Sequence, residues 1–546
     1  MKQNGWKRKV AAVLAVSALG MGMLLAGCGG DKSAAPAHDK TAAIAYMGTR
    51  SEPRMGFDPL KGFANPDGVS IFQSNLIRMN GDLSIEKEFA KDYKISDDGL
   101  TYTFDLRDDV KCSDGELLTA EDVKFTFETA AKNAYVGNLQ DIDHIDTPSK
   151  TQVVFHMKKP NSLFIYTIAR LPIVPKHAYK DGYGQNPVGS GPYKMVQWDK
   201  GQQMIVEANP YFFKGTPKLK KITFLFVGAE AALQAAKSGK IDVYEVPYNY
   251  VETKIPDSRM MEYKSAGKFT VMLPVTKPGE VTDNPNGREV GNPVTSDIAV
   301  RKALNYGIDR QAIVQNLMKG HGAPAYGVVD PEMPYYNQDT SYKDNDVEKA
   351  KQILADAGWK DTNGNGIVDK DGQEAEVVIM ADAADKMLQN VAMLLSDQAK
   401  RFGVSIKLDA KSPDEMLQRQ HKDLKLINYG SLDPMNIYFL YYGPNSGKGF
   451  YNMTYFNNPT VNGYIEKAME APNADLANDY WKKAQWDGQT GFSVQGDPSI
   501  LWLVNKNYMY QVKNGFDLGD QQSLQPGSMG WAIARNIQDW GWRDGK

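Results

Sequence analysis

The residues most able to coordinate a metal ion or to attack a substrate are six histidines and two cysteines, in a chain of 546 residues. Sites built from neighbouring ligands usually show a short, regular spacing of His, Cys or carboxylate residues. The histidines show no such spacing, and stand at His38, His144, His156, His177, His321 and His421. The sequence also lacks His-Glu-x-x-His and Gly-x-Ser-x-Gly. These patterns predict no metal site, no cofactor and no catalytic centre.

One segment imitates a calcium loop. DTNGNGIVDKDG, residues 361–372, has Asp361, Asn363 and Asn365 at the first ligand positions. Gly372 occupies the twelfth position, where such a loop needs a bidentate glutamate. Calcium remains an alternative, but the sequence favours a tight Asn-Gly hairpin turn before a strand at Val377.

The first cysteine follows an apolar run. A basic head precedes Val10–Ala26, and the run ends in Leu-Ala-Gly-Cys at Cys28. This order is typical of a secretory signal, and the run is shorter than the roughly 20 residues of a spanning helix. Leu-Ala-Gly-Cys resembles a bacterial lipobox, in which the thiol receives a diacylglycerol. We therefore expect a signal peptide at 1–27, lipidation of Cys28 and a flexible tether at 28–40; the alternative is an ordinary signal peptide that contains a cysteine.

The second cysteine, Cys112, lies in the polar sequence KCSDGE. A lipidated Cys28 has no free sulfur, so Cys112 would have no disulfide partner. A single thiol in an exported protein is usually a small buried apolar group, and we expect Cys112 to be packed.

Composition narrows the class further. The net charge is -3, with 63 basic and 66 acidic residues well mixed, so nothing indicates nucleic-acid binding. No second apolar run is long enough to span a bilayer. A chain of this length exceeds one ordinary core, which predicts two or more lobes. The sequence therefore indicates a protein outside the cytoplasm, held to a membrane by lipid.

Strand and helix patterns alternate along the chain, which favours an α/β class. Thr101–Leu106 alternates apolar and polar residues as a half-buried strand does. Thr119 and Asp309 are placed to cap the helices that follow them, and Val377–Met380 is a further strand candidate.

A family resemblance emerges from these elements. GLTYTFDLRDDVKCSDGELLTAEDVKFTFE, residues 99–128, closely resembles the signature of family 5 extracellular solute-binding proteins, the dipeptide, oligopeptide and nickel receptors of ABC importers. Cys112 stands where that family normally has an aromatic residue. Further blocks that resemble the family follow in order at residues 186–202, 209–224, 297–327 and 348–366.

The resemblance implies a two-lobed α/β fold of the periplasmic-binding-protein type II kind, with an extra subdomain and closure of the lobes around a ligand. We expect lobe I at 41–267, with the subdomain at about 81–188. Lobe II is expected at 268–495, and the chain should return to lobe I at 496–546.

The resemblance also suggests binding residues. Peptide receptors of the family often carry Asp-x-x-Asp-Pro, whose first Asp pairs with the peptide ammonium. In NYGSLDPMNIYF, residues 428–439, Asp433 and Asn436 align with the Asp-Pro and the following Asn, and Gly430 takes the ammonium-binding position. A buried ammonium without a carboxylate costs several kcal/mol. Either another acid supplies the charge or the ligand has no free N-terminus there, and metal-complex receptors have a partly similar version.

Arginines near this segment are candidates for gripping a ligand carboxylate through paired hydrogen bonds. Arg170 and Arg419 suit that role, although each could instead form a structural ion pair. Tyr429, Ser431 and Trp502 are expected wall residues, with core packing as the alternative for Trp502 and helix capping as the alternative for Asp433.

Together these features predict a monomeric, non-enzymatic substrate-binding lipoprotein of an ABC importer. It would deliver di- or oligopeptides to permease and ATPase subunits. The alternative cargo is nickel or another metal chelate, and a secreted hydrolase is a remote third reading.

Overall fold

The computed structural model describes residues 40–45, 52–63, 69–132, 139–282, 284, 287–448, 451–525 and 531–543. The expected signal peptide, Cys28 and all of the expected tether except Lys40 lie outside these ranges. Within them, no helix combines the length and the apolar character needed to cross a membrane.

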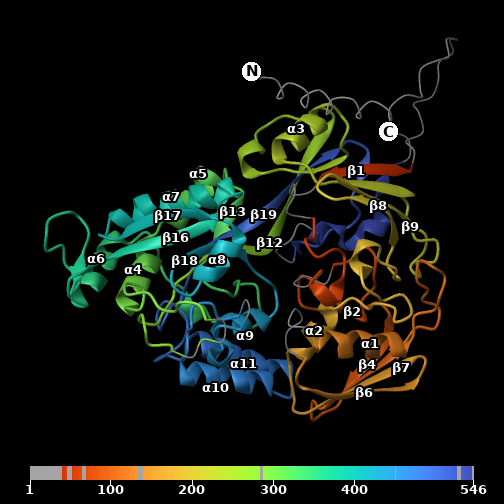
Figure 1. The fold of residues 1–546 in the computed structure, drawn as a ribbon, viewed down its shortest axis with the longest axis horizontal. Helices are drawn as coiled ribbons and strands as arrows, with labels where there is room; N and C mark the ends of the chain where they lie inside the picture. The colour runs from red at the N-terminus through yellow and green to blue at the C-terminus, as the bar shows by residue number, and fades with distance from the viewer. Residues whose placement is uncertain are drawn as a thin grey trace, which may run out of the picture. The chain divides into compact units, whose positions relative to one another are not determined.

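A mixed sheet of long and short strands organises the fold (Figure 1). Its main path runs through β17 (Ser405–Lys411), β16 (Glu376–Asp382), β18 (Leu424–Tyr429), β12 (Ser258–Met272), β19 (Ile500–Lys513), β11 (Val243–Glu245), β1 (Thr41–Ala45), β10 (Lys221–Leu225), β9 (Gln203–Ala208) and β8 (Tyr193–Asp199). β16 pairs in parallel with β17 and β18, and β1 pairs in parallel with β10 and β11. Parallel neighbouring strands must be joined by crossover connections, which are usually helices. The mixed sheet and its helices therefore confirm the α/β class predicted from the sequence.

The long antiparallel pair β12 and β19 joins different cores. Leu501 and Leu503 of β19 pack with the strands β16–β18, whereas Tyr508 and Tyr510 pack with β1 and β8–β10. The β12–β19 register shifts between Lys264 and Lys268. The expected lobe boundary at residue 267 therefore falls inside β12 at this irregularity, and the expected return at 496 falls just before β19.

Helices cover both faces of the β16–β18 half (Figure 1). On one face lie α4 (Ile298–Gly307), α5 (Arg310–Leu317), α6 (Val347–Asp356) and α7 (Lys386–Lys400). On the other lie α9 (Met435–Tyr441), α10 (Pro459–Met469) and α11 (Ala474–Gln485). The predicted cap at Asp309 is confirmed, because its carboxylate accepts a hydrogen bond from the Ala312 amide at 2.9 Å.

A smaller antiparallel sheet has the order β4 (Ala90–Ile95), β5 (Thr101–Leu106), β7 (Gln152–Met157) and β6 (Ile142–Ser149). Its core includes residues of α1 (Ala120–Ala130) and α2 (Phe164–Arg170). The predicted alternation of β5 is confirmed by buried Tyr102 and Phe104. Cys112 is fully buried in the same core, which raises the pKa of its thiol and confirms the packing prediction.

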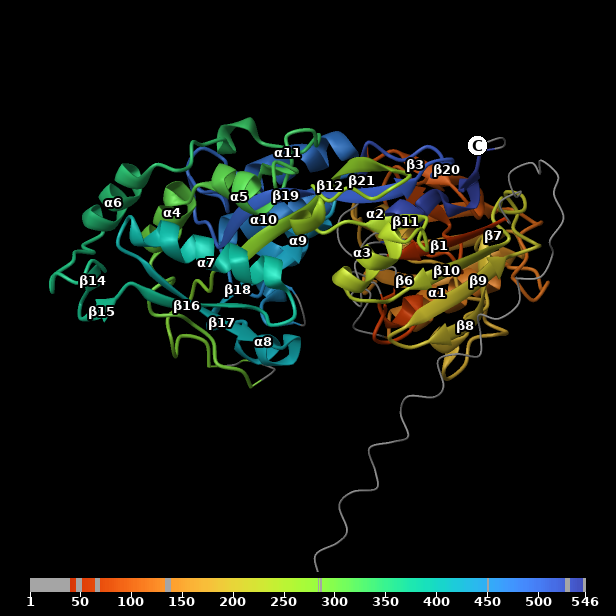
Figure 2. The ribbon, with the colours of Figure 1, turned by 90° about the horizontal axis from the view of Figure 1, so that it is seen from above.

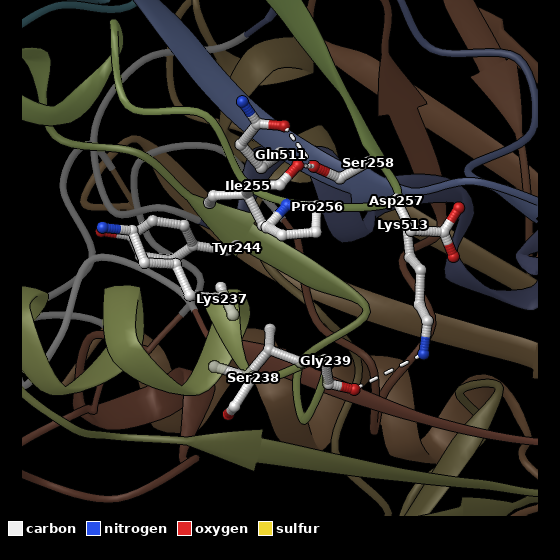
Figure 3. A pocket seen from close by; sticks show the side chains of 12 residues that line it. Lys237, Ser238, Gly239, Tyr244, Ile255, Pro256, Asp257, Ser258, Gln511 and Lys513 are labelled. Carbon is white, nitrogen blue, oxygen red and sulfur yellow. Dashed lines mark hydrogen bonds between the residues drawn. The ribbon is translucent and has the colours of Figure 1, made fainter.

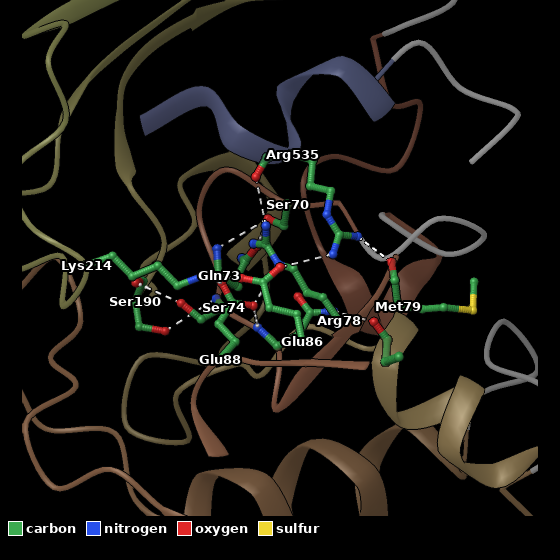
Figure 4. A network of polar contacts seen from close by, with 12 residues as sticks. Ser70, Gln73, Ser74, Arg78, Met79, Glu86, Glu88, Ser190, Lys214 and Arg535 are labelled. Carbon is green, nitrogen blue, oxygen red and sulfur yellow. Dashed lines mark hydrogen bonds and ion pairs between the residues drawn. The ribbon is translucent and has the colours of Figure 1, made fainter. Parts of the chain in front are cut away.

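A polar network joins the C-terminal segment to β2 (Ile77–Met79) and β3 (Ile85–Lys87) (Figure 4). Arg78 pairs with buried Glu88 at 2.7 Å and donates to the Arg535 carbonyl at 2.8 Å. The Arg535 guanidinium donates in turn to the Asn80 side chain at 2.8 Å, and burial lowers the pKa of Arg535 to about 10. Residues near the end of the chain thus pack with its first strands.

The calcium-like segment forms a turn beside α6, next to the hairpin of β14 (Asp369–Lys370) and β15 (Gln373–Glu374) (Figure 2). The Asp361 carboxylate accepts from the Gly364 and Gly366 amides at 2.8 and 2.9 Å. The predicted turn is therefore present, but the strands that follow it reverse at Asp371-Gly372 rather than at Asn-Gly.

A buried histidine makes stability depend on pH. His421 is fully buried, its Nδ1 lies 2.9 Å from the Met453 carbonyl, and burial lowers its pKa below the ordinary 6.5. The unfolded chain therefore takes up a proton first as the pH falls, so stability is present above pH 6.5 and declines below it. Between pH 6.5 and 5.5 the wild type should lose more stability than His421→Asn in urea unfolding, with about 1 kcal/mol as the upper limit. Parallel losses in the two proteins would contradict this account.

Candidate functional site

Helix α2 of the small-sheet region contacts α9 and α10 of the other half. The Ser162 amide donates to the Met469 carbonyl at 2.6 Å, and the Ser162 hydroxyl donates to the Ala468 carbonyl at 2.8 Å. These bonds hold the start of α2 against the end of α10. They position its last residue, Arg170, opposite the turn between β18 and α9.

A buried ion pair lies at this junction. The Arg170 Nη2 donates to the Asp433 carboxylate and to the Ser431 hydroxyl. The other Asp433 oxygen accepts from the Met435 amide at 3.0 Å, so Asp433 supports the start of α9 from the position before its N-cap, Pro434, close to the role given as its alternative. The Arg170 Nε is buried and has no hydrogen-bond partner among the described residues. A guanidinium with an unused N–H is suited to donate a hydrogen bond to a ligand oxygen.

Tyrosines surround the pair. Tyr166 and Tyr429 are half-buried and lie within electrostatic reach of Asp433, and Tyr451 lies within reach of Arg170. Burial and the Asp433 charge raise the pKa of Tyr166 to about 12. Buried Tyr335 donates its hydroxyl hydrogen to the Leu432 carbonyl, which fixes the turn next to the pair. Partly exposed aromatic rings around a polar centre are typical of small-ligand sites.

Gly430 stands where no side chain fits. Its φ is +156°, and a Cβ built on it would lie 1.9 Å from the Ala266 carbonyl oxygen. Gly430 follows β18, and Ala266 lies in the neighbouring β12. A carboxylate side chain at this position is therefore excluded by the backbone itself.

Two buried carboxylates, Asp433 and Asp330, lie near Tyr335, and both are already bound to other groups of the protein. The oxygens of Asp433 bind Arg170, Ser431 and Met435, as described above. Asp330 accepts from the fully buried Lys268 at 2.7 Å and from Asn505 at 2.8 Å. Neither carboxylate is left over to pair with a ligand ammonium.

An aromatic cavity of about 160 Å³ adjoins Trp502. The Trp502 indole donates to the Tyr441 hydroxyl at 3.0 Å, and Tyr441 stacks on Phe492 with ring centroids 3.8 Å apart. Tyr441 also lies within electrostatic reach of Tyr429. Trp502 is thus both a core residue, at 3% exposure, and a lining residue.

A larger cavity, of about 280 Å³, lies elsewhere, between α3 (Ala229–Lys237) and the start of β12 (Figure 3). Ser258 donates to the Gln511 side chain at 2.8 Å on its β12–β19 wall, and Lys513 donates to the Gly239 carbonyl at 3.5 Å. It contains one aromatic residue, Tyr244, and none of the residues around Arg170. Around Arg170, by contrast, aromatic and polar groups converge, as they do in small-ligand sites.

Comparison with known proteins identifies a family for this chain. The model of bacterial extracellular solute-binding proteins, family 5, matches residues 84–449. The chain belongs to this family. Proteins of the family are extracytoplasmic transport receptors that work with ABC permeases.

Two curated relatives and two solved structures are similar to this family 5 chain. Protein XP55 of Streptomyces lividans is 29% identical over 88% of this chain and 86% of its own. The oligopeptide-binding protein AppA of Bacillus subtilis is 29% identical over 73% of this chain and 76% of its own. Its structure with a nonapeptide has a TM-score of 0.73, with 23% identity over 92% of this chain and 99% of that one. The structure of NikZ of Campylobacter jejuni in complex with Ni(L-His) has a TM-score of 0.78, with 24% identity over 92% of this chain and 99% of that one. The two-lobed fold predicted from the sequence is confirmed.

The structure brings most of the expected site residues together. Arg170, Ser431 and Asp433 are in direct contact, and the Asn436 side chain donates to the Ser431 carbonyl at 3.1 Å. Gly430 and Tyr429 adjoin them. The sequence reasoning missed three tyrosines of the site, Tyr166, Tyr335 and Tyr451, because no motif distinguishes them from other tyrosines of the chain.

Arg419 does not join this group. Its guanidinium pairs with Asp409 and with Asp423, each at 2.6 Å, and its side chain is 36% exposed. Hydrogen bonds to both carboxylates raise its pKa, although partial burial acts in the opposite direction. The structural ion pair, given as the alternative from the sequence, is the arrangement observed.

Proposed function

We propose that this family 5 protein is the substrate-binding lipoprotein of an ABC importer, anchored through Cys28 outside the cytoplasm. It captures a peptide between its two lobes and delivers it unaltered to the permease. The observation that carries the proposal is the junction of α2 with the β18–α9 turn. There a buried Arg170 keeps an unused N–H beside half-buried tyrosines.

The chemistry of the site constrains the peptide. With Gly430 closed to side chains and both Asp330 and Asp433 already paired, neither of these two carboxylates is available to a ligand ammonium. An Arg170 N–H and tyrosine hydroxyls suit ligand carbonyl or carboxylate oxygens. The ligand is therefore a peptide held through its carbonyl or carboxylate groups, with its N-terminus outside this part of the site.

The missing ammonium partner also favours a second candidate. A metal chelate of small organic acids or amino acids presents carboxylates and needs no buried acid on the protein. The nickel–histidine complex held by NikZ is cargo of this kind in a protein of similar fold. Arg170 would then bind a carboxylate of the chelate.

Native mass spectrometry of protein purified gently from the membrane fraction tests both parts of the proposal. We expect a mature chain that begins at Cys28 and carries a diacylglycerol, with a peptide mass retained. A retained nickel–amino acid mass would instead select the second candidate. A mature chain without acyl groups would refute the anchor.

Calorimetry with mixed peptides and with nickel–histidine extends the test. Tyr429→Ala should weaken binding of the active ligand about tenfold or more, because it removes an aromatic wall. Tyr211→Ala is the matched control, since Tyr211 is 45% exposed and lies outside the site, and it should bind as the wild type does. Absence of heat from both ligand classes, or chemical conversion of the ligand, would contradict the proposal.

A further inference from the structure

Three potential metal ligands meet on the small antiparallel sheet. His144 and Asp146 belong to β6 and His156 belongs to β7, and His144 lies directly opposite His156 in the strand register. In β7 the side chains of Val153 and Phe155 are buried, so the alternation places His156 on the outer face. The three side chains are therefore neighbours on one accessible face of a rigid hairpin.

The imidazoles are aligned. The two rings are stacked with centroids 4.2 Å apart and planes 9° apart. Because an imidazole binds a metal in the plane of its ring, one of these partly exposed rings must turn for both to bind the same ion. Their Nε2 atoms face the same carboxylate oxygen, Oδ2 of Asp146, at 3.6 Å from His144 and 3.3 Å from His156. All three ligand atoms lie within 4.8 Å of one another.

These separations suit a shared ion better than direct hydrogen bonds. A charge-assisted N–H···O bond is about 2.7–2.9 Å long. With ligand bonds of about 2.1 Å, adjacent ligands of a tetrahedral zinc ion are about 3.4 Å apart. The two oxygen–nitrogen distances match the second value.

A second carboxylate orients the His144 ring from the side opposite its Nε2. Its Nδ1 lies 2.8 Å from the Asp143 carboxylate. Metal-binding histidines commonly donate their second ring N–H to a carboxylate, which fixes the tautomer and leaves the other nitrogen free for the metal. Asp143 thus supplies the supporting group that such a site requires.

We propose that His144, Asp146 and His156 form a surface site for a divalent transition metal that favours imidazole, with Zn²⁺ as the reference ion. Two histidine nitrogens and one carboxylate oxygen supply three ligands, and water completes a tetrahedron. Ni²⁺ and Cu²⁺ also favour imidazole and are expected to bind. The site includes none of the residues around Arg170, so it takes up the free ion independently of the transported ligand.

Calorimetric titration of the untagged mature protein with Zn²⁺, in a buffer that does not bind metals, tests the site. We expect one Zn²⁺ per chain. His144→Gln and His156→Gln should each weaken binding about 100-fold or abolish it, and Asp143→Asn should weaken it about 10- to 100-fold through loss of orientation. His177→Gln is the matched control, because His177 faces a single carboxylate, Asp114, and should leave the titration unchanged.

Circular dichroism shows whether the variants are still folded. We expect them to be, because the three substituted side chains are accessible to solvent. Cobalt(II) absorption provides a second readout, because a tetrahedral site gives intense visible bands that His156→Gln should remove. Absence of binding by Zn²⁺, Ni²⁺ and Cu²⁺ would overturn the proposal. So would binding that survives both histidine substitutions.

Discussion

Arg170→Met is expected to lower the free energy of unfolding by about 3–5 kcal/mol. The substitution keeps much of the side-chain volume but leaves the Asp433 carboxylate buried without its counter-charge. Asp433 is fully inaccessible as a side chain and Arg170 is 8% exposed, so solvent cannot compensate for the loss. Chemical denaturation at neutral pH measures the effect.

Arg419→Met is the matched control for that experiment. Arg419 pairs with two carboxylates, Asp409 and Asp423, but its side chain is 36% exposed. Solvent-accessible ion pairs contribute about 1 kcal/mol or less. Because Arg419 and Asp409 are about one-third exposed, although Asp423 is only 10% exposed, the control should cost less stability than Arg170→Met. Replacing both members of the buried pair, as in Arg170→Met with Asp433→Leu, should recover part of the loss because no unpaired charge remains. Equal costs for Arg170→Met and Arg419→Met would contradict the structural distinction between the two arginines.

The sequence predicted the fold because the family blocks and the strand and helix patterns agree along the chain. Local signals also identified the capping role of Asp309 and, closely, the support that Asp433 gives to the start of α9, since such bonds join residues two or three positions apart. The burial of Cys112 followed from its expected lack of a disulfide partner. These features require little knowledge of which distant segments meet.

Features that depend on contacts between distant segments could be predicted only in part from the sequence. Arg170 and Asp433 are 263 positions apart, and only the docking of α2 on α9 and α10 shows that they pair. Arg170 and Arg419 were equivalent candidates in the sequence, and burial separates them. The spacing of His144 and His156 has no meaning as a linear motif, because the strand register is what places them opposite each other.

The close approach at Gly430 has the same long-range origin and determines what the site can bind. Its φ of +156° favours glycine, and the Ala266 carbonyl occupies the space that a side chain would need. Ala266 belongs to β12, which pairs with β18, so relief of the clash would require the two strands to move apart. An acid at position 430 would therefore disrupt the sheet before it could bind an ammonium group.

Gly430→Ala should accordingly reduce the free energy of unfolding by at least about 3 kcal/mol, or prevent accumulation of folded protein. Gly463→Ala is the matched control. Gly463 lies inside α10, with no atom within 4 Å of an added Cβ, and alanine there should stabilise the helix by up to about 1 kcal/mol. Urea unfolding of both variants measures the contrast. A Gly430→Ala protein as stable as the wild type would show that the backbone tolerates a side chain at this position, and the absence of an ammonium partner would then be a matter of residue choice rather than of the fold.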